Sequence, residues 1–143
     1  MGQSDFDAAI ERFREALHQY VQGDPSAVIA CLSRREDVTL ANPIGPPRVG
    51  PTEVDNATAH GASLLSEGSV RGFEEISRYS TPDLGYVLQI ERTQARMPGG
   101  DDVVPFALRV TMIFRPEDGE WKVVHRHADP ITTDRPISTV IEK

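Results

Sequence analysis

Residues 104–129 read VPFALRVTMIFRPEDGEWKVVHRHAD, and this stretch decides the fold class. Apolar and polar side chains alternate along both of its halves, which is the period of a half-buried β-strand. The halves are separated by Glu117-Asp118-Gly119, residue types that favour a tight hairpin turn. The stretch therefore predicts two antiparallel strands, at about 104–115 and 121–128.

The same period of two continues upstream. Runs at about 70–80 and 85–97 alternate in the same way, and the turn-forming segments Thr81-Pro82-Asp83 and Pro98-Gly99-Gly100-Asp101 separate them. Each connection has hairpin length, so neighbouring strands should pair antiparallel and in sequence order. We therefore predict a four-stranded meander and not a βαβ fold.

The N-terminal part has a helical period instead. Apolar residues recur there in steps of three and four over about 4–22, at Phe6, Ile10, Phe13, Leu17 and Tyr20. Gly23-Asp24-Pro25 ends this helix and begins a short one that we expect to end near Ser33. A third helix should begin near Pro51 or Thr52. The pattern predicts an α+β fold, a cone-shaped barrel of curved antiparallel sheet covered by three N-terminal helices.

Length and charge limit the possible partners. A chain of 143 residues with 38% apolar residues suits one domain over 1–143, with a core at about 5–130 and a tail at 131–143. The formal charge of −7 disfavours nucleic acid. We see neither a membrane-length apolar run nor a signal-peptide pattern, so we expect no membrane partner and a cytoplasmic location. The only cysteine, Cys31, cannot form an internal disulfide and is expected to be buried.

The strand register selects the candidate site residues. A turn centred near Gly100 places Tyr86 opposite Phe114 on an apolar face, which Trp121, His125 and His127 would join. Polar groups on such a face need an explanation, and a histidine titrates near neutral pH. We therefore predict His127 as the catalytic acid or base. Tyr86, His125 and Trp121 are predicted to bind the substrate.

Two further groups are alternatives. Glu91 and Arg109 would face each other on the reverse, polar side as an ordinary cross-strand pair. A register slip of one residue would turn both inward, so they are second choices for catalysis. Asn42, Arg48 and His60 should lie at the rim of the cone, where a guanidinium could bind a carboxylate or enolate oxygen.

No cofactor or metal is predicted. His125, His127 and Asp129 alternate along one strand, but any residues at this spacing share a face, and no third ligand at a fixed distance is visible. His18 and His60 are the other histidines that could complete a site. Gly99-Gly100 lacks the spacing of a phosphate-binding loop.

Several segments resemble a known family. They are Arg48-Val49-Gly50-Pro51, Leu84-Gly85-Tyr86, Ile90-Glu91-Arg92, Arg109-Val110-Thr111 and Gly119 to Asp129 with its His-x-His-x-Asp ending. Over about residues 5–130 the chain resembles a SnoaL-like domain of the nuclear transport factor 2-like superfamily. That superfamily includes ketosteroid isomerase, scytalone dehydratase, polyketide cyclases, kinase association domains and transport adaptors. The resemblance implies a cone-shaped pocket and a homodimer.

The resemblance leaves two hypotheses open. Isomerase-like members use a pocket carboxylate as base, and the register above places none on the apolar face, whereas cyclase-like members use an acid or a histidine, a role open to His127 with Tyr86. The first hypothesis is a cofactor-independent isomerase, cyclase or dehydratase that moves a proton within a small apolar carbonyl compound. The alternative is a non-catalytic ligand-binding or dimeric association module.

Overall fold

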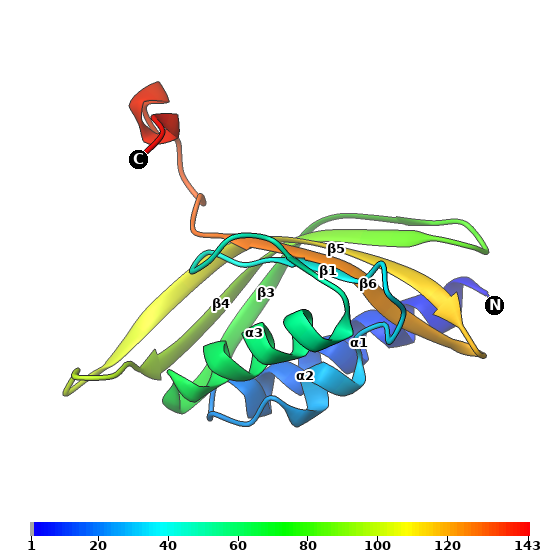
Figure 1. Cartoon of the computed structure of the whole chain (residues 1–143), viewed down its shortest axis with the longest axis horizontal. Helices are drawn as coiled ribbons and strands as arrows, with labels where there is room; N and C mark the ends of the chain where they lie inside the picture. The colour runs from blue at the N-terminus through cyan, green and yellow to red at the C-terminus, as the bar shows by residue number, and fades with distance from the viewer. Residues whose placement is uncertain (1) are drawn as a thin grey trace.

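The computed structural model describes residues 2–143, and in this part of the chain three α-helices lie on one side of a six-stranded sheet (Figure 1). The helices are α1 (Gln3–Tyr20), α2 (Ser26–Ala30) and α3 (Pro51–Ser63). The strands are β1 (Thr39–Ala41), β2 (Arg48–Val49), β3 (Ser66–Ser80), β4 (Gly85–Arg96), β5 (Val103–Glu117) and β6 (Glu120–Asp129). A 3₁₀ turn, Ile137–Val140, follows in the C-terminal tail. The predicted α+β class is confirmed.

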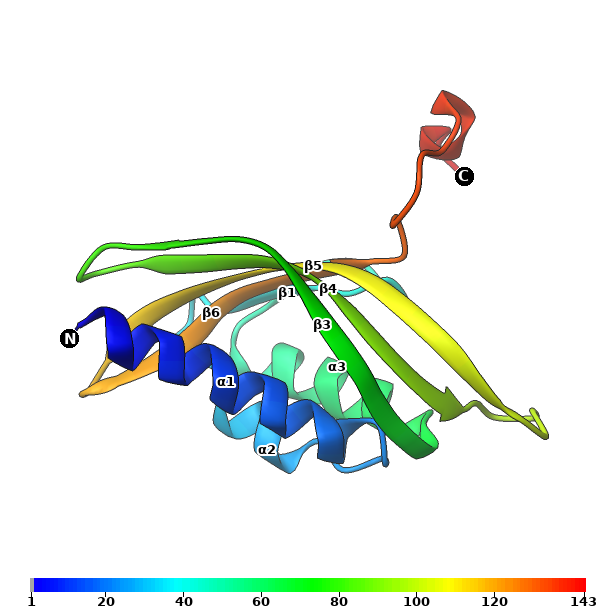
Figure 2. The ribbon, with the colours of Figure 1, turned by 180° about the vertical axis from the view of Figure 1, so that it is seen from behind.

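The strand order is β2-β1-β6-β5-β4-β3. Strands β3 to β6 pair antiparallel in sequence order, as the predicted meander requires. The short strand β1 adds to β6 in parallel and to β2 antiparallel, which was not predicted. The sheet curves over the helices (Figure 2), but its order has two ends, so it is an open sheet and not the expected barrel.

Helix α1 covers the sheet with the apolar stripe predicted from its period. Phe6, Ile10, Phe13 and Leu17 are all buried. The ring of Phe6 packs edge-on against Phe114 of β5, with centroids 5.5 Å apart. The stripe therefore joins the helix to the sheet through the hydrophobic core.

Helix α2 ends at Ala30, earlier than the expected end near Ser33. The backbone after α2 forms hydrogen bonds with β6: Val123 N donates to Cys31 O at 2.9 Å, and Ser33 N donates to Val123 O at 2.8 Å. Cys31 O and Ser33 N thus form hydrogen bonds with a strand and not within a helix. The Cys31 side chain is buried, as predicted, and burial raises the pKa of its thiol.

The predicted pairing of β4 with β5 is wrong by one residue. Gly85, and not Tyr86, pairs with Phe114, and Glu91 pairs with Leu108. Arg96 pairs with Val103, so the turn is centred between Gly99 and Gly100 and not on Gly100. Because side chains alternate between faces, this single step reverses every side chain of β4. Gln89 and Glu91 consequently face the helices, and Tyr86 faces away from them.

A β-bulge in β6 produces the second correction. Phe114 pairs with Val123, but the preceding Ile113 pairs with His125, so Val124 is an extra residue. Trp121 and Val123 face the helices before the bulge, and Arg126 and Ala128 face them after it. His125 and His127 therefore lie on the outer face, opposite to the prediction.

Candidate functional site

Three polar side chains, Gln89, Glu91 and Arg126, lie together on the inner face of the sheet, and we call them the interior cluster. The Arg126 guanidinium forms a bidentate ion pair with the Glu91 carboxylate, with Nη1–Oε2 and Nη2–Oε1 distances of 2.8 and 2.7 Å. Gln89 Nε2 donates to the same Oε2 at 3.0 Å. The exposed fraction of Glu91 is 3%. Protein donors thus already occupy both oxygens of this buried carboxylate.

Arg14 of α1 connects the interior cluster to the surface. Its Nε and Nη2 atoms donate to Gln89 Oε1 at 2.9 and 2.6 Å. Nη2 also lies 2.9 Å from Glu75 Oε1 of β3, and Arg78 Nε donates to Glu75 Oε2 at 3.0 Å. Alternating charges therefore compensate one another from the surface into the core, which is the condition for burying them at low cost.

The surroundings of the interior cluster shift the pKa values of Arg126 and of the neighbouring Tyr20. Burial would lower the pKa of Arg126, but the neighbouring Glu91 carboxylate outweighs it and raises this pKa. Burial raises the pKa of Tyr20, Arg126 opposes this and Glu91 adds to it, so the phenol stays neutral at neutral pH. The Arg126 guanidinium also lies over the Phe13 ring, 5.1 Å from its centroid.

Sequence reasoning found only part of this cluster. Glu91 was a second choice, and the one-residue slip that turns it inward is the register observed. Gln89 and Arg126 were expected on the polar reverse face, and both face the helices. Arg109 stays on the outer face, where it pairs with Asp129 at 2.7 Å. The bulge at Val124, which turns Arg126 inward, has no clear signal in the local sequence.

His127 and His125 lie on the outer face, so the prediction that they face a cavity beneath the helices is wrong. His127 Nε2 is 3.0 Å from Asp129 Oδ2, and His125 Nδ1 is 2.7 Å from Thr39 Oγ1. Burial, together with the neighbouring His127, lowers the pKa of His125. Burial would raise the pKa of Asp129, but hydrogen bonds from Arg109, Ile131 N–H and His127 lower it. The role of His127 in proton transfer stays a prediction.

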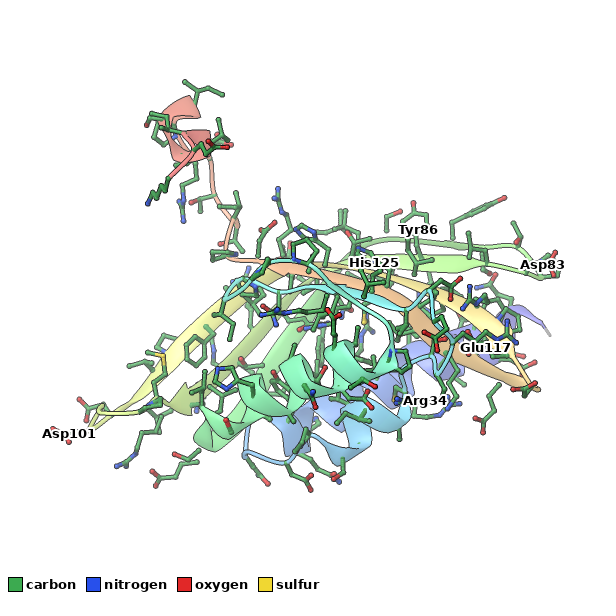
Figure 3. All side chains as sticks on the ribbon, in the orientation of Figure 1. Arg34, Asp83, Tyr86, Asp101, Glu117 and His125 are labelled. Atoms are coloured by element: carbon green, nitrogen blue, oxygen red, sulfur yellow. The ribbon has the colours of Figure 1, made fainter. Side chains whose placement is uncertain are left out.

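Tyr86 and Trp121 also differ from their expected positions. Tyr86 lies on the side of the sheet away from the helices, with its hydroxyl 3.0 Å from Ser77 Oγ (Figure 3). Trp121 faces inward as predicted, but it packs in the core against Phe6 with centroids 5.3 Å apart. Its Nε1 atom is buried without a hydrogen-bond partner among residues 2–143. Their predicted contacts with a substrate are not tested.

A cavity of about 350 Å³, which we call the rim pocket, lies between the β1–β2 connection and α3. Its wall contains all three residues predicted to rim the cone, Asn42, Arg48 and His60. The other lining residues are Ile44, Gly45, Glu53, Asn56 and Ala57. Asn42 Oδ1 accepts a hydrogen bond from Ile44 N at 3.1 Å, which shapes the loop around the opening. Sequence reasoning missed Glu53 and Asn56.

The backbone around the rim pocket explains how its charged groups are positioned. Gly50 has a φ of 87°, in the left-handed region that favours glycine, and it turns the chain from β2 into α3. Pro51 then occupies the first turn of α3, where no amide hydrogen is needed. Arg48 lies on one side of this turn and Glu53 on the other, so the turn places both side chains at the same opening.

Arg48 has no ion-pair partner within the described part of the chain, unlike Arg14, Arg78 and Arg126. A guanidinium in a concave, partly enclosed site is suited to a carboxylate or to a developing enolate oxygen. His60 supplies an imidazole in the same wall, and Glu53 supplies a carboxylate. The rim pocket thus combines an anion-binding group with two groups that can exchange a proton.

Comparisons with known proteins agree with this fold. The sequence model of the SnoaL-like domain matches residues 8–132, which is most of the chain. The chain belongs to the SnoaL-like domain family. No curated protein sequence matches it.

Solved structures place this SnoaL-like chain in the nuclear transport factor 2-like fold. A ketosteroid isomerase-like protein from Erwinia carotovora atroseptica is 19% identical with a TM-score of 0.74, covering 91% of this chain and 96% of that chain. A proposed dehydratase from Streptomyces avermitilis has the same identity, score and coverage of this chain, and 97% of its own length is covered. A proposed calcium/calmodulin-dependent protein kinase type II association domain from Thiobacillus denitrificans is 22% identical, with a TM-score of 0.64 and 87% and 93% coverage. At these identities the likeness shows the fold alone.

Among residues 2–143, no group of three or more His, Cys, Asp or Glu side chains has an arrangement that could hold a metal ion. No helix in the same part of the chain is long and apolar enough to cross a membrane. Among residues 2–143, the rim pocket brings an arginine, a histidine and a glutamate into the wall of one cavity.

Proposed function

We propose that this chain is a cofactor-independent enzyme of the isomerase, cyclase or dehydratase type that moves a proton within a small carbonyl compound held in the rim pocket. The observation that supports this most is that Arg48, which has no ion-pair partner among residues 2–143, lines one cavity together with His60 and Glu53. A volume of about 350 Å³ suits a small ligand, near the lower end of known pockets. Neighbours of this fold include a ketosteroid isomerase-like protein and a proposed dehydratase.

The mechanism assigns one role to each side chain. The Arg48 guanidinium binds the carbonyl oxygen and stabilises the negative charge that develops there when the α-proton leaves. The His60 imidazole accepts that proton and returns it at a second carbon. Asn42 and Asn56 supply amide groups that orient the ligand. The wall is more polar than an apolar ligand would need, so the proposal is for a carbonyl compound with a carboxylate or hydroxyl group.

The interior cluster is a scaffold in this proposal. Glu91 is held by three protein donors and is 3% exposed, so a substrate has no access to its oxygens without displacing Arg126. A carboxylate base needs a free oxygen within hydrogen-bond reach of the proton it removes. We therefore assign the proton transfer to His60 and not to Glu91.

The proposal is tested by proton exchange, which does not require the physiological substrate. The protein would be incubated in D₂O with acetoacetate, 2-oxobutanoate and 3-hydroxy-2-butanone, and loss of the α-proton signals would be followed by NMR. We expect His60→Gln to lower catalysed exchange at least 100-fold, since general acid–base catalysis contributes about 10²–10⁴. Arg48→Met should weaken binding of the carboxylate probes more than that of the neutral one.

His18→Gln is the matched control, because His18 is an exposed histidine on α1, outside the rim pocket. It should leave exchange unchanged. Full exchange by His60→Gln would refute the assignment. Loss of exchange in a folded Glu91→Gln variant, with His60→Gln unaffected, would move the chemistry to the interior cluster.

We also propose that the chain forms a homodimer through the outer face of its sheet. That face contains Tyr86, Leu88, Ile90 and Ile113 where a polar surface was predicted, and a neighbour of this fold is a proposed association domain. Half-buried apolar residues on a solvent-facing sheet favour covering by a second copy. Sedimentation equilibrium at micromolar concentration should give twice the chain mass of 15.8 kDa. A monomeric mass would contradict the dimer and leave the enzyme proposal standing.

A further inference from the structure

The C-terminal arm, residues 130–143, leaves the body of the protein and projects into solvent. It rises from the side of the sheet opposite the helices (Figures 1 and 2). Its hydrogen bonds are local, such as Ile131 N to Asp129 Oδ1 at 3.0 Å and Thr139 N to Pro136 O at 3.0 Å. Every residue from 133 onward is exposed. Within the described residues 2–143, the body of the protein therefore leaves the arm from residue 133 onward uncovered.

The arm nevertheless ends in an apolar surface. In the 3₁₀ turn Ile137–Val140, Ile137 and Val140 are three positions apart and therefore lie on the same side, and Ile141 follows the turn directly. The exposed fractions of Ile137, Val140 and Ile141 are 84%, 72% and 67%. A single turn of this kind is not stable alone and needs a surface on which to bury its apolar side.

A matching apolar surface lies on the outer face of the sheet, near the β3–β4 turn. Tyr79 and Tyr86 pair directly across β3 and β4, and Tyr86 pairs with Ile113 on β5. Leu84 lies in the adjoining turn. Tyr79, Leu84 and Tyr86 are 63%, 50% and 37% exposed. We call these four residues the outer-face patch.

The arm and the outer-face patch lie at different levels along the strands. The arm begins after Asp129, which pairs with Arg109, and Arg109 pairs with Ile90. Tyr86 is four residues from Ile90 along β4, a shift of about 13 Å at a strand rise of about 3.3 Å per residue. Figure 1 shows the arm toward one end of the sheet and the β3–β4 turn at the other. The arm therefore points away from the patch of its own chain.

Consider two copies that face each other through their outer faces, related by a two-fold axis that runs between the sheets and perpendicular to the strands. The strands of the second copy then run in the opposite direction. The arm of each copy therefore lies toward the end of the partner that carries the outer-face patch, and the contact is reciprocal. The segment 130–136 can span up to about 24 Å when extended, more than the about 10 Å between two packed sheets. The arm contains two acidic and two basic residues, so it adds no net charge to a contact between chains of charge −7.

We propose that the chain exchanges C-terminal arms in a dimer, with Ile137, Val140 and Ile141 of one copy packed on the outer-face patch of the other. This inference rests on the dimer proposed above. It adds a specific occupant for the patch and a function for the tail.

The first test measures the dimer dissociation constant by sedimentation of the full-length chain. The double variant Ile137→Asp/Val140→Asp should raise this constant at least tenfold, because two apolar side chains are lost from the contact. Ser138→Asp/Thr139→Asp adds the same charge to the same turn and should change the constant less than threefold. All four positions are exposed, so circular dichroism should show an unchanged fold for both variants.

The second test locates the arm by disulfide formation between differently tagged chains. Val140→Cys in one chain should cross-link to Tyr79→Cys in the other, whereas Val140→Cys with Glu15→Cys on α1 should not. The native Cys31 is buried and gives little background.

The outcomes separate the two proposals. If the arm substitutions leave the dimer dissociation constant unchanged and the Val140–Tyr79 cross-link does not form between chains, the arm exchange is overturned and the dimer proposal stands. A monomer at every concentration would overturn both. A cross-link within one chain carrying both cysteines, in place of one between chains, would show that the arm folds onto its own sheet and would also overturn the proposal.

Discussion

Replacing Arg126 by methionine tests the interior cluster most directly. The variant keeps most of the side-chain volume but leaves the Glu91 carboxylate, 3% exposed, with Gln89 Nε2 as its remaining donor among residues 2–143. Breaking a buried ion pair on one side costs about 3–5 kcal/mol of folding free energy. Loss of the contact with the Phe13 ring adds about 0.5–2 kcal/mol. We expect the variant to be less stable than the wild type by at least about 3 kcal/mol.

The double variant Glu91→Met/Arg126→Met should be more stable than Arg126→Met alone. Replacing a whole buried pair by apolar residues of similar volume is often neutral or stabilising, because no unpaired charge is left behind. Gln89 loses one acceptor in the double variant, at a cost of about 1–3 kcal/mol. The double variant should therefore recover roughly 2 kcal/mol or more of the single variant's loss.

Urea unfolding followed by fluorescence of the single tryptophan, Trp121, measures both effects. With a slope of about 1–3 kcal/mol per molar urea, the Arg126→Met midpoint should fall by roughly 2 M. Arg109→Met is the matched control, because its partner Asp129 lies on the outer face and exposed pairs contribute about 0–1 kcal/mol. A double variant no more stable than Arg126→Met would refute the explanation by uncompensated charge.

Three other changes have equally definite outcomes. Gly68→Ala should lower stability by about 1–3 kcal/mol in the same urea assay, because its new Cβ would overlap the backbone carbonyl of Val21, and a wild-type midpoint would contradict this. Ser33→Ala should cost about 1–3 kcal/mol, since Ser33 Oγ donates to the buried Glu117 carboxylate at 2.7 Å, whereas exposed Ser138→Ala should cost nothing measurable. The pKa of His125 is lowered from its ordinary 6.5, so the unfolded chain binds the proton more readily, and the His125 contribution to stability is present above about pH 6.5 and lost as pH falls below it toward the folded pKa. His125→Gln should flatten the fall in thermal midpoint between about pH 7.5 and 5.5, and an unchanged slope would refute the assignment.

Local patterns in the sequence were sufficient for the three helices and the four long strands. The step of three and four from Phe6 to Leu17 predicted a helix, and alternation predicted four strands, because both signals repeat over many residues. The turn Asp118-Gly119 was also predictable, since both residues have positive φ of 53° and 86°, which these residue types tolerate. Asn42, Arg48 and His60 were expected at the rim because they lie on the segments that would surround the opening of the cone, and all three line the rim pocket.

Which face of a strand is buried was not predictable for β4 and the end of β6. The β4–β5 turn is centred half a residue from Gly100, and Val124 is inserted as a bulge in β6. A shift of half a residue in the turn centre changes the strand pairing by one residue, and the bulge also changes it by one. Because side chains alternate between the two faces of a strand, each change exchanges the inner and outer faces of the strand that follows or precedes it. The pairing of Glu91 with Arg126, and the outward position of His127, follow from these two displacements.

The sequence by itself determined the class of fold, the family resemblance, the order of the strands from β3 to β6 and the segments that form the rim pocket. Only the tertiary structure showed that the sheet stays open at β2, that the interior cluster forms beneath the helices and that the arm is exposed. These depend on contacts between residues far apart in the chain, such as Glu91 with Arg126 and Leu40 with Arg126. Local periodicity does not encode such contacts, because packing selects among registers that the local sequence leaves almost equal in energy.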